Sequence, residues 1–131
     1  MNIQQAAKQS GLSAKMIRHY EQIGMVPKAK RSLANYRRYE ANDVHLLRFV
    51  RRARGLGFST ADIKQLVGLW RNKSRPSAAV KRIAAGHADE LKRKIHELQS
   101  MVAALDDLVL HCHGDERPEC PILEDLATER T

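Results

Sequence analysis

The longest regular pattern in the chain is a stripe of apolar residues that recur at alternating intervals of four and three positions between residues 84 and 109. This heptad spacing is typical of a coiled-coil helix. The rest of the chain is too short to cover the stripe, so we expect two copies to pair along it; packing on the preceding helices of the same chain is the alternative. The stripe consists of Ala84, Ala88, Leu91, Ile95, Leu98, Val102, Leu105 and Val109.

Two short helices joined by a tight turn are predicted at the start of the chain. The first spans residues 3–8 and stops at Gly11, because a residue without Cβ readily adopts the left-handed conformation that ends a helix. Ser13 is a suitable N-cap for the second helix, which runs up to Gly24. Its apolar positions at helical spacing are Met16, Tyr20 and Ile23. This is the helix-turn-helix pattern, which many small helical cores share.

A β-hairpin and two further helices are predicted next. Pro27 ends the helical pattern, and residues 28–39 mix turn formers with tyrosines, so we expect short strands around a turn at residues 32–35. One helix then begins at residue 41 or 42 and ends at Gly55 or Gly57, and another starts after Ser59, with Asp62 as a capping-box-like partner. Residues 71–77 form a linker. The expected core positions are Val44, Leu47, Phe49 or Val50, Ala53, Ile63, Leu66, Val67 and Trp70.

Length and composition indicate the number of domains and the compartment of the protein. A chain of 131 residues has room for one domain with an extension. It contains neither an apolar run of about 18 residues nor a signal-peptide pattern, so we expect a soluble, cytoplasmic protein with no membrane partner. In a reducing compartment the two cysteines are poor candidates for a structural disulfide, although they could form a redox-active pair or bind a metal.

Charge is concentrated in the first half of the chain. Residues 1–75 carry 16 Lys+Arg against 4 Asp+Glu, a net charge of +12, whereas residues 76–131 carry 7 against 11, a net charge of −4. Such a basic segment attracts polyanions through Coulomb forces and counterion release. The charge alone favours nucleic acid or an anionic membrane surface as the partner, and a merely solvated basic face is the alternative. Of these two partners we expect nucleic acid and not a membrane.

The helix-turn-helix pattern supplies candidate contacts to double-stranded DNA. In this motif the N-terminal part of the second helix reaches base edges in the major groove, and flanking groups hold phosphates. Tyr39 could equally be a core residue of the hairpin. The candidate DNA-binding residues are Ala14, Lys15, Arg18, His19 and Tyr20 in the second helix, Arg31, Tyr36, Arg37, Arg38 and Tyr39 in the hairpin, and Arg54 in the next helix.

Three segments resemble the MerR family of metal- and stress-responsive transcription regulators: "MNIQQAAKQSGLSAKMIRHYEQIGMV", "RSLANYRRY" and "LLRFVRRARGLGFSTADIKQLV". The resemblance implies a mainly α fold, with a winged helix-turn-helix in residues 1–75, an antiparallel coiled-coil dimerisation helix in residues 76–110, and a metal-binding loop with a short helix in residues 111–131. It also implies a homodimer that distorts promoter DNA for RNA polymerase. Asn35 departs from the glycine usual before "YRxY", but asparagine tolerates a positive φ.

Cys112 and Cys120 are the candidate metal ligands. Two sulfurs are enough for a soft monovalent ion in linear coordination, whereas Zn(II) prefers four ligands and a [2Fe-2S] cluster needs about four cysteines. The spacing C-x7-C followed by "PILEDLA" resembles the CueR branch of the family, also called HmrR, which responds to Cu(I) and to Ag(I) and Au(I). By this resemblance Ser77 stands near the metal, where sensors of divalent ions carry a cysteine. We expect a short helix with Ile122, Leu123 and Leu126 packed over the loop.

Other interpretations of the cysteine loop remain. His111 and His113 flank Cys112 and could complete a zinc site, although simultaneous chelation by "HCH" is geometrically awkward. A divalent-metal regulator of the same family or a small metal-buffering protein would use the same thiolates. A thiol oxidoreductase lacks support because there is no CxxC motif. With no phosphate-binding loop and no catalytic triad pattern, we expect a non-enzymatic protein.

Overall fold

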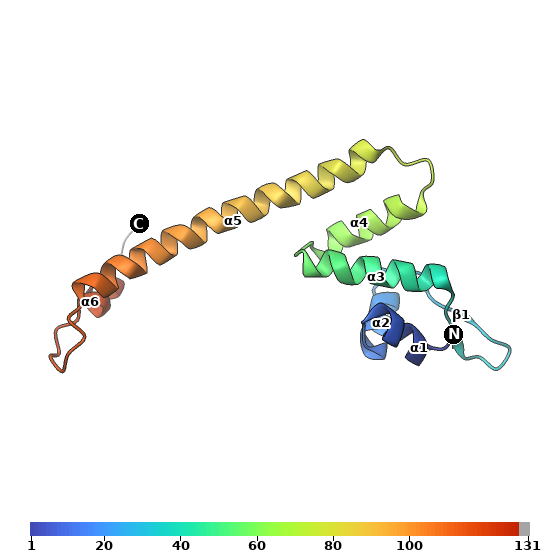
Figure 1. The fold of residues 1–131 in the computed structure, drawn as a ribbon, viewed down its shortest axis with the longest axis horizontal. Coiled ribbons are helices and arrows are strands. Elements are labelled where there is room, and N and C mark those ends of the chain that lie inside the picture. The colour runs from blue at the N-terminus through green and yellow to red at the C-terminus, as the bar shows by residue number, and fades with distance from the viewer. Residues whose placement is uncertain (129–131) are drawn as a thin grey trace. The chain divides into compact units, whose positions relative to one another are not determined.

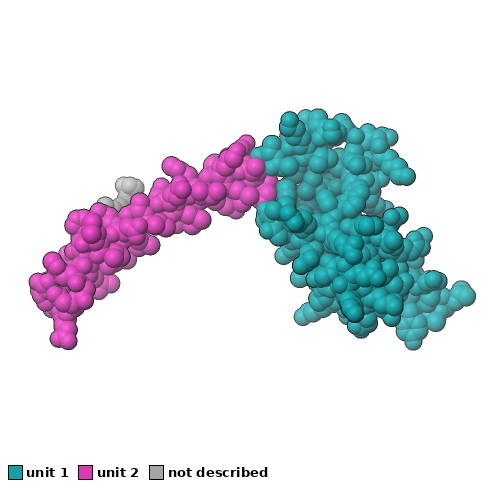
Figure 2. All heavy atoms as spheres, in the orientation of Figure 1, with its two compact units in different colours: residues 1–85 teal, residues 86–131 magenta. Residues whose placement is uncertain are grey.

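The computed structural model describes residues 1–128 and divides into two compact units. The first comprises Met1–Ala85 and the second begins at Gly86 (Figure 2). This boundary, defined by packing, lies within one long helix. The division by function into residues 1–75, 76–110 and 111–131 remains a proposal.

The first unit contains four complete helices, one small hairpin and the start of the long helix. The elements are α1 (Ile3–Ser10), α2 (Ala14–Gln22), β1 (Lys30–Arg31), β2 (Arg37–Arg38), α3 (Ala41–Gly55) and α4 (Thr60–Arg71). Helix α1 packs against α2 and α3, and α3 also packs against α4 (Figure 1). The predicted mainly helical fold with a helix-turn-helix and a small wing is therefore confirmed.

Local capping explains where the first helices begin and end. The Asn2 side chain accepts a hydrogen bond from the Gln5 backbone N–H, and the Gln5 side chain accepts one from the Asn2 N–H, each at 2.9 Å. Ser13 Oγ accepts from the Met16 N–H at 3.1 Å, as expected for an N-cap. Helix α1 extends to Ser10, two residues beyond the prediction, and Gly11 follows with φ of 78°. The turn is therefore set by the residues that the sequence singled out.

The core differs from the predicted one at three places. On α2 Ile17 is buried together with the predicted Tyr20, whereas Met16 and Ile23 are only half-buried. On α3 the choice between Phe49 and Val50 falls on Val50, because Phe49 lies at the edge of the core. Trp70 was expected in the core, but it is 38% exposed and packs edge-on against Phe49, with ring centroids 4.6 Å apart. Helix α4 thus ends at the rim of the unit.

The hairpin has the predicted turn. Lys30 pairs with Arg38 and Arg31 with Arg37 in an antiparallel register. The Asn35 N–H donates to the Ser32 carbonyl at 2.9 Å, and Asn35 has a φ of 65°. Asparagine therefore occupies the positive-φ position that the resemblance assigns to glycine.

The second unit consists of most of α5 (Ser77–His111) and the short helix α6 (Pro121–Ala127). The larger side chains of the heptad stripe lie exposed in the single chain; from Leu91 to Val109 their exposed fractions run from 38% to 62%. Within the described residues of the second unit, these side chains are therefore left exposed to solvent. Within residues 1–128, no helix has both the length and the apolar character needed to cross a membrane.

Candidate nucleic-acid interface and thiolate loop

Helix α2 presents a basic face opposite its buried face. Ile17, Tyr20 and Glu21 turn toward the core. Lys15 and the pair Arg18 and His19 follow at spacings of three and four, so their side chains share the exposed face. Ala14, the first residue of the helix, is half-buried. This arrangement suits a helix that inserts its N-terminal half into the major groove.

Two of the candidate DNA-binding residues are core residues instead. Tyr20 is 2% exposed and Tyr39 is 3% exposed, so neither ring offers a surface to a ligand. Their burial argues for a core role of both, which for Tyr39 is the alternative that the sequence leaves open. Tyr20 has a different role, because the guanidinium carbon of Arg54 lies 5.8 Å from the centre of its ring. The ring thereby supports a cation that is itself exposed.

Some arginines of the hairpin are exposed to solvent, and another is paired with a carboxylate of the same unit. Arg31 and Arg38 are exposed, as is Tyr36, which lies two residues before the end of β2. Arg31 Nη1 donates to the carbonyl of Asn35 at 3.2 Å across the turn. Arg37 is only half-buried, but its Nε points back to helix α2, where it meets a carboxylate. The hairpin thus offers two arginines and a tyrosine to a ligand and directs a third arginine inward.

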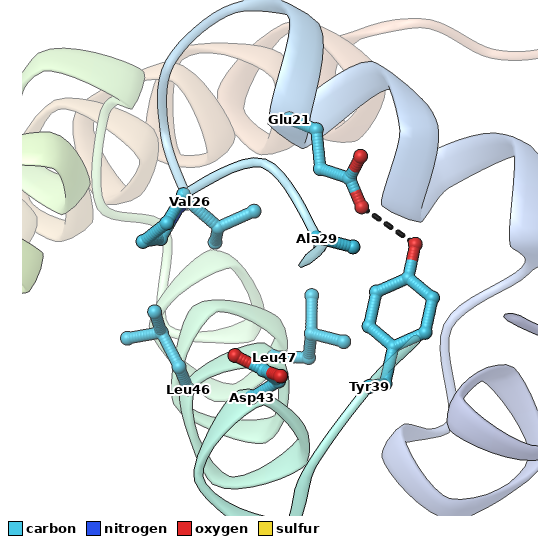
Figure 3. A pocket seen from close by; sticks show the side chains of 8 residues that line it. Glu21, Val26, Ala29, Tyr39, Asp43, Leu46 and Leu47 are labelled. Carbon is cyan, nitrogen blue, oxygen red and sulfur yellow. Dashed lines mark hydrogen bonds between the residues drawn. The ribbon is translucent and has the colours of Figure 1, made fainter. Parts of the chain in front are cut away.

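That carboxylate belongs to Glu21, a residue that the sequence reasoning missed. Glu21 is 6% exposed, its Oε2 accepts from Arg37 Nε at 3.2 Å, and its Oε1 accepts from the Tyr39 hydroxyl at 2.6 Å. Figure 3 shows the Glu21 carboxylate pointing toward the Tyr39 hydroxyl beside a small pocket that Val26 and Leu47 also line. A signal existed in the sequence, since Glu21 is one of only four acidic residues in residues 1–75.

The Tyr39 hydroxyl is held in its neutral form. Burial, then the hydrogen bond to Glu21 and the charge of that carboxylate, raise the pKa of Tyr39 far above its ordinary value of 10.0. The positive charges of Arg37 and Arg18 oppose this shift only in part. The tyrosine therefore acts as a hydrogen-bond donor throughout the neutral pH range.

Two arginines of α3 lie against the turn between α1 and α2, and one of them forms a hydrogen bond there. Arg48 Nε donates to the carbonyl of Gln9 at 2.9 Å, near the C-terminal end of α1, where carbonyls lack intrahelical partners. The guanidinium of Arg51 lies 2.9 Å from where a Cβ on Gly11 would stand. Part of the high positive charge of this unit is therefore used to hold the helix-turn-helix together.

The two thiols lie at the ends of a loop between α5 and α6. Cys112 follows α5, and its N–H donates to the Val109 carbonyl at 3.2 Å; Cys120 is the N-cap residue of α6, and its carbonyl accepts from the Glu124 N–H at 3.1 Å. Both cysteines are free thiols and half-buried. Each predicted ligand is thus anchored by backbone hydrogen bonds to a neighbouring helix, whereas Gly114, with φ of 67°, lies in the loop between them.

The surroundings of the thiols match the expectations only in part. His111 Nδ1 lies 2.7 Å from the Asp107 carbonyl, so that nitrogen is engaged, and His113 is exposed. Ser77 is the first residue of α5 and is exposed. The short helix exists as expected, but of the three apolar residues that should cover the loop only Ile122 is half-buried; the other two, Leu123 and Leu126, are 68% and 66% exposed. Within residues 1–128 no cluster of three or more His, Cys, Asp and Glu side chains could hold a metal ion.

The sequence and the fold are both similar to those of known transcription regulators. Residues 1–68 match the family model "MerR HTH family regulatory protein", and residues 44–108 match "MerR, DNA binding". The chain is 57% identical over 127 residues to "Heavy metal-dependent transcription regulator 2" of Rhizobium meliloti, covering 97% of this chain and 86% of that protein. It is 41% identical to the transcriptional regulator CueR of Escherichia coli O157:H7, covering 97% and 94% of the two chains. The crystal structure of a lead(II)-bound transcription regulator from Ralstonia metallidurans gives a TM-score of 0.86 at 29% identity, covering 97% and 99%.

Proposed function

Because the chain belongs to the MerR family of helix-turn-helix regulatory proteins, we propose that it is a metal-responsive transcription regulator that senses Cu(I) and activates copper-resistance or efflux genes. The family consists of transcription regulators and not of enzymes. The observation that carries the proposal is the combination, in one chain, of a basic helix-turn-helix with two free thiols flanking a loop.

The DNA partner is double-stranded promoter DNA. Lys15, Arg18 and His19 on α2 enter the major groove, where Arg18 can donate to guanine in bidentate fashion. The exposed hairpin residues Arg31, Tyr36 and Arg38 contact the backbone, and Arg54 adds a further cation supported by Tyr20. Ala14 lies close enough to the helix start for apolar contact with a base. By this proposal the protein acts in the cytoplasm, together with its DNA.

The effector is held by Cys112 and Cys120. The donor set fits a soft monovalent ion, because both sulfurs are free and half-buried and two thiolates complete a linear coordination shell. Cu(I) is the proposed ion, with Ag(I) and Au(I) as further ligands of the same chemistry. Ser77, as a residue that cannot supply a third sulfur, is proposed to stand near the metal site of the assembled protein. The similarity to CueR supports this choice, and the higher similarity to a regulator named only as heavy metal-dependent leaves the ion to experiment.

A homodimer is proposed to form through the exposed heptad stripe of α5. An antiparallel coiled coil would remove from water the apolar side chains that each single chain leaves exposed. The dimer would then place two helix-turn-helix units on one promoter, and metal binding would favour a state that bends and untwists the DNA for RNA polymerase. By this proposal residues 1–75 read DNA, residues 76–110 dimerise and residues 111–131 sense the metal.

In vitro transcription from a bound promoter, with Cu(I), Ag(I), Zn(II) or no metal, tests the proposal. Cu(I) and Ag(I) should activate transcription, and Cys112→Ser or Cys120→Ser should abolish activation while leaving operator binding intact. His113→Ala is the matched control, because it alters an exposed neighbour and should preserve activation. Activation by Zn(II) that depends on His113 would instead establish the alternative, a divalent-metal regulator of the same family.

X-ray absorption of the Cu(I)-loaded protein provides a second measurement. Two short Cu–S distances without nitrogen neighbours are expected from a two-thiolate site. A four-coordinate shell of nitrogen and sulfur would favour the zinc interpretation. A protein that binds Cu(I) but no DNA would favour the other alternative, a small metal-buffering protein, which leaves the basic half of the chain without a role.

Arg18→Ala tests the reading helix. The affinity for specific DNA should fall by about 1 to 3 kcal/mol if Arg18 reads a base. Lys64→Ala on α4 is the control, since it removes an equally exposed positive charge that lies outside the proposed contact set. Equal affinities of the two variants would remove Arg18 from the contact set.

A further inference from the structure

We propose that Glu21 is a positioning residue for DNA binding: it holds Arg37 and, through Tyr39, the end of the hairpin, and so fixes the wing (residues 30–38) against the reading helix α2. The inference rests on the proposed DNA-binding function. It explains how helix α2 and the wing, two separate elements that contact DNA, keep a fixed orientation relative to each other. Glu21 itself is buried, so its carboxylate is not offered to DNA as a contact.

The wing cannot hold its own position. Its two strands have two residues each and form a two-stranded sheet that pairs with no other strand of the described residues. An isolated hairpin of this size is marginally stable at best. The contacts that tie its base to the rest of the unit include the Tyr39 N–H, which donates to the Met1 carbonyl at 2.7 Å, and the two bonds to Glu21. The direction of the exposed wing cations therefore depends on Glu21 as well as on the paired backbone bonds between Tyr39 and Met1.

Local rules disfavour an acidic residue at position 21. Glu21 lies in the last turn of α2, where the helix dipole destabilises negative charge, and its carboxylate is withdrawn from water. Both penalties are offset by the charge-assisted bonds from Arg37 and Tyr39. An apolar residue would fill this place without either penalty. Glu21 is thus a buried charge that both rules disfavour. The geometry that it imposes on Arg37 and Tyr39 explains its presence more simply than a gain in stability does.

Removal of the Glu21 carboxylate should change the affinity for DNA in opposite directions, depending on whether its charge or its positioning of the wing matters. DNA is a polyanion, so the loss of a negative charge from the DNA-binding unit should tighten binding if only electrostatics matter. If Glu21 positions the wing, its loss should weaken binding, because the wing must then be ordered when the DNA binds. An increase or a decrease in DNA affinity therefore distinguishes a purely electrostatic effect of Glu21 from a positioning role.

The decisive comparison is between Glu21→Gln and Glu40→Gln in the full-length protein. Both remove one negative charge from the same unit, but Glu40 is exposed at the start of α3, and a glutamine there can still accept the backbone hydrogen bond of the cap. In Glu21→Gln the amide oxygen can still accept from Tyr39, but the amide N–H2 cannot accept from Arg37 Nε. The probe is a labelled duplex recovered by the wild-type protein from random-sequence DNA.

We expect Glu21→Gln to bind this duplex about tenfold to a hundredfold more weakly, the equivalent of one lost hydrogen bond to a charged group, and Glu40→Gln to bind as tightly as the wild type or more tightly. Circular dichroism at the assay temperature establishes that each variant is folded. If Glu21→Gln does not fold, Tyr39→Phe decides, since it removes only one hydroxyl and should also weaken binding. Equal affinities of the folded Glu21 and Glu40 variants would overturn the inference.

Two further readouts distinguish positioning from a lost phosphate contact. The slope of binding affinity against salt concentration should stay unchanged in Glu21→Gln, whereas loss of the phosphate contact in Arg38→Ala should reduce it by about one. In an Arg37→Ala background, Glu21→Gln should have little additional effect, because the pair acts as a unit. If the wild type recovers no duplex at all, the proposed function itself fails, and that outcome is distinct from normal binding by Glu21→Gln.

Discussion

Tyr39→Phe should destabilise the DNA-binding unit while leaving it folded. The substitution removes a hydroxyl that lies 2.6 Å from Glu21 Oε1 in a site where Tyr39 is 3% exposed. A hydrogen bond to a charged group contributes about 1.5 to 3 kcal/mol, and the carboxylate oxygen left behind cannot reach water freely. Because Arg37 still contacts the other oxygen, we expect a loss toward the lower end, about 1.5 to 2 kcal/mol in the free energy of unfolding.

Urea unfolding followed by tryptophan fluorescence measures this change in the right part of the molecule. Trp70 is the only tryptophan of the chain and packs on Phe49 in the same unit. Tyr36→Phe is the matched control: it removes the same hydroxyl from a side chain that is 73% exposed and should change the free energy by less than about 0.5 kcal/mol. Equal midpoints for the two variants would refute the assignment of the Tyr39–Glu21 bond as a stabilising contact.

The same pair of variants should differ in alkaline solution. The pKa of Tyr39 is higher in the folded than in the unfolded chain, so its contribution is complete below the ordinary tyrosine pKa of 10.0 and declines as the pH rises above that value. The decline reaches about 1.4 kcal/mol per pH unit for one group. Unfolding titrations should therefore show a shallower alkaline loss in Tyr39→Phe than in Tyr36→Phe, and parallel curves would contradict the proposed shift.

Four other substitutions give clear expectations. Leu98→Asp, on the exposed stripe of α5, should shift the protein from dimer to monomer in sedimentation velocity while leaving the Trp70 unfolding curve unchanged, and a persistent dimer would rule out this stripe as the interface. Gly11→Ala should lower the free energy of unfolding by at least about 1 to 2 kcal/mol, because Gly11 has a φ of 78° and an added Cβ would meet Arg51. Gly86→Ala, in an open helical position, should instead raise helix stability by about 0.5 to 1 kcal/mol. Stability changes of the same sign in both variants would be inconsistent with the described turn. Ser13→Ala should cost about 0.5 to 2 kcal/mol through the lost N-cap, as measured by thermal unfolding, and no change would show that the cap is dispensable.

The sequence was most informative where structure depends on neighbouring residues. The N-cap at Ser13, the helix end at Gly11 and the positive φ at Asn35 each follow from the chemistry of one residue and its immediate neighbours. The heptad stripe predicted a long helix because its period is itself the geometry of the helix. The position of the cysteines at the ends of a short loop is likewise a property of the linear chain.

Properties that depend on distant residues were not predictable in the same way. Tyr20 and Tyr39 appeared as candidate DNA contacts because tyrosine is suited equally to a surface hydroxyl contact and to a core. Their burial, and the pairing of Glu21 with residues 16 and 18 positions away, depend on how α2 and the hairpin pack. The sequence by itself thus determined the helices, the turn, the basic half and the two thiols. Only the tertiary structure decided which cations face outward and which one is bound to a buried carboxylate, because burial is a property of three-dimensional packing and not of order along the chain.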